Sequence, residues 1–179
     1  MRPIPREALR RTEATHRIPS MKRLSLHELT GPVSLLLRLP LTGEPIAKIA
    51  AEHEQVIQAS RKVWLGVFGS KLSSQTLEVL NSRGEYLYMM QMGRRGVIAY
   101  RGLIAGVAEF PAASDLRLVP RYYEEKGLTP LAKFWVQLSS LDPVAVDELD
   151  ELRVARTGTM VLDLFRSMTS VAIIVKKHS

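Results

Sequence analysis

The feature that most constrains the fold of this chain is an apolar run with two glycines, Val97-Ile-Ala-Tyr-Arg-Gly-Leu-Ile-Ala-Gly-Val-Ala-Glu-Phe110. Val, Ile, Tyr and Phe suit a half-buried pleated surface, and glycine permits a sharp bend, so the run predicts two strands joined by a tight turn at Arg101-Gly102. Gly106 predicts a bulge or a barrel corner. We therefore expect an α+β fold with a small mixed β-barrel, flanking helices and an N-terminal extension.

The flanking sequence predicts the other elements from their apolar spacing and turn residues. Residues 44–60 show helical periodicity, residues 72–80 form a short helix capped by Ser73 or Ser74, and Asp142-Pro143 opens a third helix. A helical turn is expected within residues 117–126, and residues 33–39 are interpreted as a strand or a short helix. The remaining expected strands cover residues 62–68, 85–92, 131–139, 159–165 and 171–177.

The charge of the chain is concentrated at its N-terminal end. The sequence divides into a basic, proline-punctuated extension, residues 1–43, and a domain, residues 44–179. Residues 1–23 contain seven basic and two acidic side chains, so they carry +5 of the net charge of +7. A basic arm on a near-neutral body is typical of proteins that contact phosphate, although such an arm is also compatible with a solubilising tail or with a working start at Met21.

Several kinds of chemistry are disfavoured by composition and spacing. The chain has no cysteine, which excludes disulfides, thiolate zinc sites and cysteine nucleophiles. The four histidines, His16, His27, His53 and His178, have no metal-ligand spacing, and His53 is expected in the core. No phosphate-binding glycine loop, nucleophile elbow, membrane-length apolar run or secretory signal is present, so we expect no cofactor, metal or membrane and a cytoplasmic location. The carboxylate pairs at 147–148 and 150–151 are assigned to a solvated helix face.

From Lys62 onward, the order of elements resembles the EVE domains of the PUA-like superfold. The resemblance rests on Trp64-Leu-Gly-Val-Phe68, Tyr86-Leu-Tyr88, Gly96-Val-Ile-Ala-Tyr100, Ile104-Ala-Gly-Val107, Phe134-Trp-Val-Gln-Leu138 and Val161-Leu-Asp-Leu-Phe165-Arg-Ser167. The chain departs from the family pattern because Arg94-Arg95 precede the turn glycine and no acidic residue follows it. The first 60 residues match no part of the family pattern.

The resemblance implies a PUA-like barrel that binds nucleic acid, RNA or DNA, without catalysis, through a pocket for a modified or flipped base. Aromatic rings stack on bases and arginines contact phosphate in such sites. The implied base pocket consists of Ser70, Lys71, Tyr86, Tyr88, Arg166 and Ser167. The implied contacts to the nucleic-acid backbone are Arg94, Arg95 and Arg101. Trp64 or Trp135 is expected to be structural, and the protein is expected to be a monomer or a weak homo-oligomer.

Two other classes of function stay open at this point. A hydrolytic enzyme of the broader superfold would need Lys71 to converge with Glu109 or Asp163 in one pocket. A protein–protein adaptor would instead use the helix at 44–60 and the apolar segment 33–41 as its interface.

Overall fold

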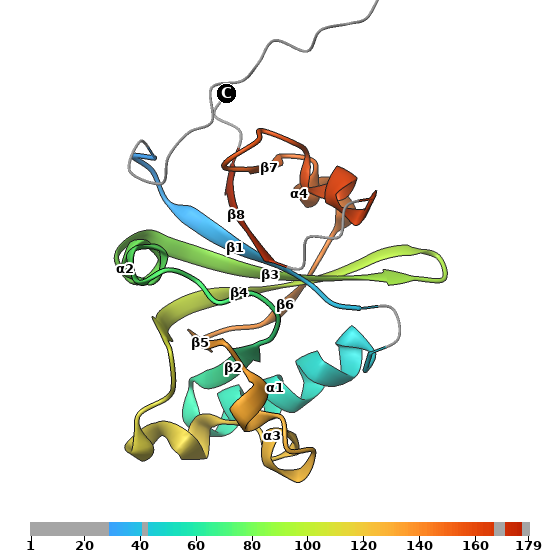
Figure 1. Ribbon diagram of the computed structural model, residues 1–179. Coiled ribbons are helices and arrows are strands. Elements are labelled where there is room, and N and C mark those ends of the chain that lie inside the picture. The colour runs from blue at the N-terminus through green and yellow to red at the C-terminus, as the bar shows by residue number, and fades with distance from the viewer. Residues whose placement is uncertain (1–28, 41–42, 167–170, 177–179) are drawn as a thin grey trace, which may run out of the picture.

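The computed structural model describes residues 29–40, 43–166 and 171–176, and these form a mixed sheet with a few helices (Figure 1). The expected α+β class is confirmed. The elements in chain order are β1 Val33–Arg38, α1 Ile46–Ser60, β2 Val63–Val67, α2 Ser74–Arg83, β3 Gly84–Gly93, β4 Gly96–Ala108, α3 Tyr122–Glu125, β5 Phe134–Leu138, β6 Asp142–Val144, α4 Val146–Leu149, β7 Leu152–Val154 and β8 Val171–Lys176. Short 3-10 helices lie at Ala113–Leu118 (η1), Thr129–Leu131 (η2) and Val161–Arg166 (η3).

The eight strands form one twisted sheet whose order is β2-β5-β4-β3-β1-β8-β7, with β6 paired to β4. Strands β1 and β3 are parallel, and every other pair is antiparallel. Within the described residues the path runs from β2 to β7 without joining its ends, so the expected barrel is not confirmed.

Most of the apolar run at 97–110 lies in one long strand, β4, and the predicted turn at Arg101-Gly102 is wrong. Arg101 and Gly102 continue the pairing with β3, opposite Tyr88 and Leu87. A Cβ on Gly102 would lie 2.8 Å from the carbonyl oxygen of Ser140, so this glycine permits close approach of a neighbouring backbone. The predicted bulge at Gly106 is confirmed, because the pairing of β4 with β5 shifts register between Ile104 and Gly106.

Strand β1 lies in the interior of the sheet, between β3 and β8. Its apolar run Val33–Leu37 is buried on both faces, which explains why its sequence lacks an alternating pattern. The predicted boundary between residues 43 and 44 therefore separates β1 from the other strands of the same sheet. The basic arm at residues 1–23 lies outside the described residues.

Two predictions in the C-terminal part are wrong. Asp142 and Pro143 lie in the short strand β6, opposite Arg101 and Tyr100, and the following helix α4 begins only at Val146. Proline is tolerated there because β6 pairs only with β4 and is three residues long. The strand expected at 159–165 is mainly the 3-10 helix η3, with only Met160 forming a bridge to Arg153.

Three hydrophobic clusters hold the layers together. The largest includes side chains from β1, β2, β3, β4, β5, α1 and α2. A second joins the other face of β1 and β3 to α4 and η3. The third packs Trp64 and Trp135, both buried as structural residues, against Leu118 and Tyr123. Burial on both faces of the sheet accounts for the high apolar content of its strands.

The predicted helices at 44–60 and 72–80 are confirmed as α1 and α2. Helix α1 is anchored to the sheet because its first backbone N–H, of Ile46, donates a hydrogen bond of 2.9 Å to the side-chain oxygen of Gln91 on β3. Ser73 caps α2 by accepting a hydrogen bond from the Thr76 N–H. Among the described residues, no helix has the length and hydropathy needed to cross a membrane.

Candidate functional site

Two exposed positive charges lie at the tip of the β3–β4 hairpin. Gly93 pairs with Gly96, so Arg94 and Arg95 form the two-residue turn, and both are exposed. Gly96 has a φ of +124°, a conformation that favours glycine after the turn. Figure 1 shows this hairpin extending to one side of the sheet, past the helices. Within the described residues, neither arginine has an ion-pair or hydrogen-bond partner.

Further along the same two strands, Tyr86, Arg101 and Glu148 form a cluster. The guanidinium carbon of Arg101 lies 4.8 Å from the centre of the Tyr86 ring, a cation–π geometry. The same guanidinium donates a hydrogen bond to the Glu148 carboxylate on α4, and the two side chains are 30% and 34% exposed. Sequence reasoning missed Glu148, which it placed on a solvated face. No signal in the sequence indicated this partner, because Arg101 was expected in a turn and not in the middle of a strand.

Tyr88 stands beside this cluster but is fully buried. Its ring makes an edge contact with Tyr86 at 6.1 Å, and its hydroxyl has no hydrogen-bond partner among the described residues. Burial raises the pKa of the Tyr88 phenol, while the nearby Arg101 charge acts in the opposite direction. Tyr88 thus supports the packing beneath Tyr86, and the ring that the surface offers is that of Tyr86.

The other predicted pocket residues lie elsewhere. Ser70 and Lys71 are exposed in the loop after β2, and the Lys71 ammonium is 3.3 Å from the Glu109 carboxylate just beyond β4. Seven residues of extended strand separate Arg101 from the end of β4, a span of roughly 23 Å. Arg166 ends η3, with its side chain outside what is described, and Ser167 lies outside the described residues. The structure therefore brings Tyr86, Tyr88 and Arg101 together and keeps Ser70 and Lys71 apart from them.

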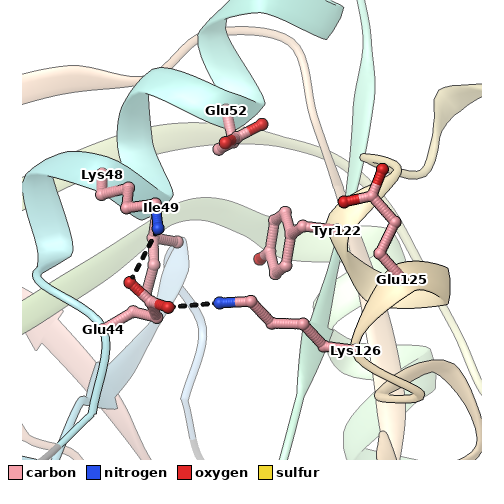
Figure 2. A pocket seen from close by; sticks show the side chains of 7 residues that line it. All are labelled: Glu44, Lys48, Ile49, Glu52, Tyr122, Glu125 and Lys126. Atoms are coloured by element: carbon pink, nitrogen blue, oxygen red, sulfur yellow. Dashed lines mark hydrogen bonds and ion pairs between the residues drawn. The ribbon is translucent and has the colours of Figure 1, made fainter.

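A pocket that the sequence did not reveal lies between α1 and α3 (Figure 2). Its volume is about 110 Å³, and it is lined by Glu44, Lys48, Ile49, Glu52, Tyr122, Glu125 and Lys126. The segment Tyr122-Tyr-Glu-Glu-Lys126 gave no signal for a pocket, because the two walls are 70 or more positions apart in the sequence.

Beneath this pocket, the half-buried Tyr122 packs on two buried rings, those of Tyr123 and His53. Tyr122 stacks on Tyr123 at 4.4 Å and meets the His53 ring edge-on at 5.9 Å. His53 is fully buried, as predicted, and one ring nitrogen contacts the Ile49 carbonyl oxygen at 2.7 Å while Nε2 has no partner in the described part. Burial lowers the pKa of His53 to about 4, so the ring is neutral at pH 7.

Neither lysine–carboxylate pair resembles a catalytic centre. Lys71 and Glu109 are more than 60% exposed, so their ion pair is a surface contact without the burial that tunes an acid or base. In the pocket, the hydrogen bond from Lys126 holds the pKa of Glu44 below its usual value, with Lys48 acting in the same direction. A carboxyl group shifted this way stays ionised, which is unsuitable for a general acid near pH 7. No group of three or more metal-ligating side chains gathers within the described ranges.

The protein–protein adaptor hypothesis needs segment 33–41 at the surface, and most of this segment is buried. Residues 33–38 are β1, whose apolar side chains are buried inside the sheet, so they are unavailable to a partner. Helix α1 remains at the surface, with its buried face packed on the sheet through Ile46, Ala50 and His53.

Comparison with known proteins adds no assignment to this geometry: neither protein-family models nor curated proteins nor solved structures gave a match to the chain.

Proposed function

We propose that this protein is a non-catalytic nucleic-acid-binding module whose interface is the β3–β4 hairpin. The observation that carries the proposal is the pair of exposed arginines, Arg94 and Arg95, at the tip of a hairpin that extends past the helices. Arginine side chains without internal partners are available to phosphate, whose contacts supply affinity without sequence information.

The stem of the hairpin supports a base contact. Tyr86 is partly exposed, and Leu103, directly opposite it on β4, is 42% exposed. Because the Arg101 guanidinium lies over one face of the Tyr86 ring, a base would stack on the guanidinium plane or on the other face of the ring. Because Glu148 already neutralises Arg101, we assign phosphate contact to the tip and base stacking to the stem.

The spacing of these two parts sets the length of the ligand. Eight residues of strand separate Tyr86 from Arg94, which corresponds to roughly 26 Å. A single strand that contacts both parts must span several nucleotides, within the range of about 4–16 that single-strand-binding domains cover. We further propose that the domain is an EVE-type, PUA-like module. Its base contact would then be a pocket for a modified or flipped base.

The test is a titration of the full chain with a fluorescent single-stranded oligonucleotide of about 16 nucleotides, as RNA and as DNA, over a series of salt concentrations. We expect the double variant Arg94→Gln/Arg95→Gln to weaken binding and to reduce the salt slope. Tyr86→Leu should weaken binding with little change of slope. Arg117→Gln/Arg121→Gln removes the same charge from exposed positions on η1 and before α3, and it should bind like the wild type. Equal losses in the two double variants would overturn the assignment to the hairpin.

A further inference from the structure

We propose that the pocket between α1 and α3 binds a compact ammonium cation, a ligand distinct from the nucleic acid of the proposed function. The pocket has a volume of about 110 Å³, which is room for a small group such as the head group of an amine. Three glutamates and two lysines line it, so its charge is −1 in a protein whose net charge is +7.

The carboxylates of the pocket differ in their ion-pair partners. Glu44 accepts both internal cations, with the Lys48 ammonium at 3.2 Å and the Lys126 ammonium hydrogen-bonded to its other oxygen. In the part of the chain that the structure describes, Glu52 and Glu125 have no ion-pair partner. Figure 2 shows both lysines directed at Glu44, while the carboxylates of Glu52 and Glu125 lie above that pair in the view, with the Tyr122 ring between the two walls.

The aromatic wall gives the site its preference for an organic cation. Tyr122 is held by stacking on the buried Tyr123 and by edge contact with His53, so its ring is fixed. Burial raises the pKa of Tyr122 far above its ordinary value, and the neighbouring Tyr123 and the charges of Glu52 and Glu44 act in the same direction. A fixed aromatic ring beside unpaired carboxylates is the arrangement that recognises ammonium groups.

The protein already contains an internal example of this contact. The Lys126 ammonium lies 6.0 Å from the centre of the Tyr122 ring while it binds Glu44. A ligand cation would make the corresponding contacts with Tyr122, Glu52 and Glu125. The described carboxylates are not gathered closely enough to hold a metal ion, so the larger ammonium group fits the site better.

The experiment is a titration of ¹⁵N-labelled full-length protein, followed through the backbone amides of Glu52, Tyr122 and Lys126. The probes are tetramethylammonium chloride and n-butylammonium chloride, each compared with sodium chloride at equal ionic strength. We expect saturable shifts with a millimolar Kd for at least one ammonium salt and none with sodium. Tighter binding of tetramethylammonium assigns a methylated head group, and tighter binding of butylammonium assigns a primary amine such as a lysine side chain.

Matched variants locate the site. Glu52→Gln and Glu125→Gln should each weaken binding about three- to fivefold, as expected for loss of one partly exposed ion pair. Glu54→Gln on α1 and Glu124→Gln on α3 make the same charge change outside the pocket and should bind like the wild type. Tyr122→Phe keeps the ring and should retain binding, whereas Tyr122→Leu should abolish it.

Three results would overturn the proposal. These are shifts that do not saturate, equal shifts with sodium, and equal losses in Glu52→Gln and Glu54→Gln. If Tyr122→Leu fails to fold, the comparison of the glutamine variants and Tyr122→Phe decides alone. None of these measurements uses nucleic acid, so a failure here is separate from a failure of the proposed function.

Discussion

The β3–β4 hairpin and the α1–α3 pocket place charge on the surface in opposite ways. At the hairpin tip, Arg94 and Arg95 stand at the end of two strands and belong to none of the three hydrophobic clusters. In the pocket, charged side chains surround the Tyr122 ring, which packs on the buried rings of His53 and Tyr123. Changes at the tip should therefore affect binding alone, whereas changes beneath the pocket should affect stability.

The largest expected effect is acid destabilisation through His53. Its pKa is about 4 in the folded protein and about 6.5 in an unfolded chain, so between these values the unfolded state binds more protons. The contribution of neutral His53 to the free energy of unfolding is therefore fully present above pH 6.5 and is lost as the pH falls toward 4. The loss is at most about 3 kcal/mol, since one pKa unit corresponds to about 1.4 kcal/mol.

Urea unfolding at several pH values, compared between the wild type and His53→Gln, measures this contribution. Glu44 also has a lowered pKa and causes its own loss of stability at lower pH. Because Glu44 is present in both proteins, the difference between their slopes of unfolding free energy against pH reports His53 alone. Identical slopes for the two proteins would show that His53 is not buried as described.

The next effect concerns Tyr123, whose hydroxyl accepts a hydrogen bond of 2.9 Å from the Gly66 N–H on β2. Tyr123→Phe leaves this buried N–H without a partner, which should cost about 1–3 kcal/mol of unfolding free energy. Thermal unfolding measures the loss. The exposed residue Phe68, which stacks on Tyr123 at 6.2 Å, provides a control: Phe68→Leu should cost clearly less. Equal Tm values for the wild type and Tyr123→Phe would contradict the account.

A smaller effect, on binding alone, is expected at the hairpin tip. Arg94→Gln/Arg95→Gln should change the unfolding free energy by less than about 0.5 kcal/mol, as is usual for surface substitutions. If this variant unfolds at a clearly lower urea concentration than the wild type, the hairpin tip contributes to stability, and the contrast with the α1–α3 pocket is wrong.

The smallest effect is expected at the stem. Glu148→Gln removes the anionic partner of Arg101, which frees the guanidinium for phosphate. Oligonucleotide affinity should rise by less than about fivefold, in keeping with a partly exposed ion pair worth up to about 1 kcal/mol. Asp147→Gln, at the exposed neighbouring position, makes the same charge change and should raise affinity less. Weaker binding of Glu148→Gln would show that Glu148 orients Arg101 for the ligand.

Local patterns predicted much of this fold. Apolar periodicity and caps located α1, α2 and most of the strands, because these signals depend on residues close in sequence. Gly102 misled the interpretation, since glycine serves a turn and a close backbone approach equally well, and only the position of Ser140 separates the two. Asp142-Pro143 has the composition of a helix start, but pairing with β4 overrode that preference.

The candidate site was less predictable. Tyr86, Tyr88 and Arg101 share one face of paired strands, so strand alternation alone could group them. The partnership of Arg101 with Glu148, 47 positions away, and the pocket between α1 and α3 depend on how separate elements pack. Such long-range contacts leave no trace in the spacing of residues along the chain.

The interior position of β1 has a consequence for the order of folding. Its neighbours are β3, joined through parallel pairing, and β8, which comes more than 130 positions later in the chain. During synthesis, β1 therefore emerges early but keeps one edge without a partner until β8 has been made. Such long-range pairing slows folding and exposes an unpaired apolar strand in the meantime. We therefore expect the nascent chain to depend on chaperones more than its modest size implies.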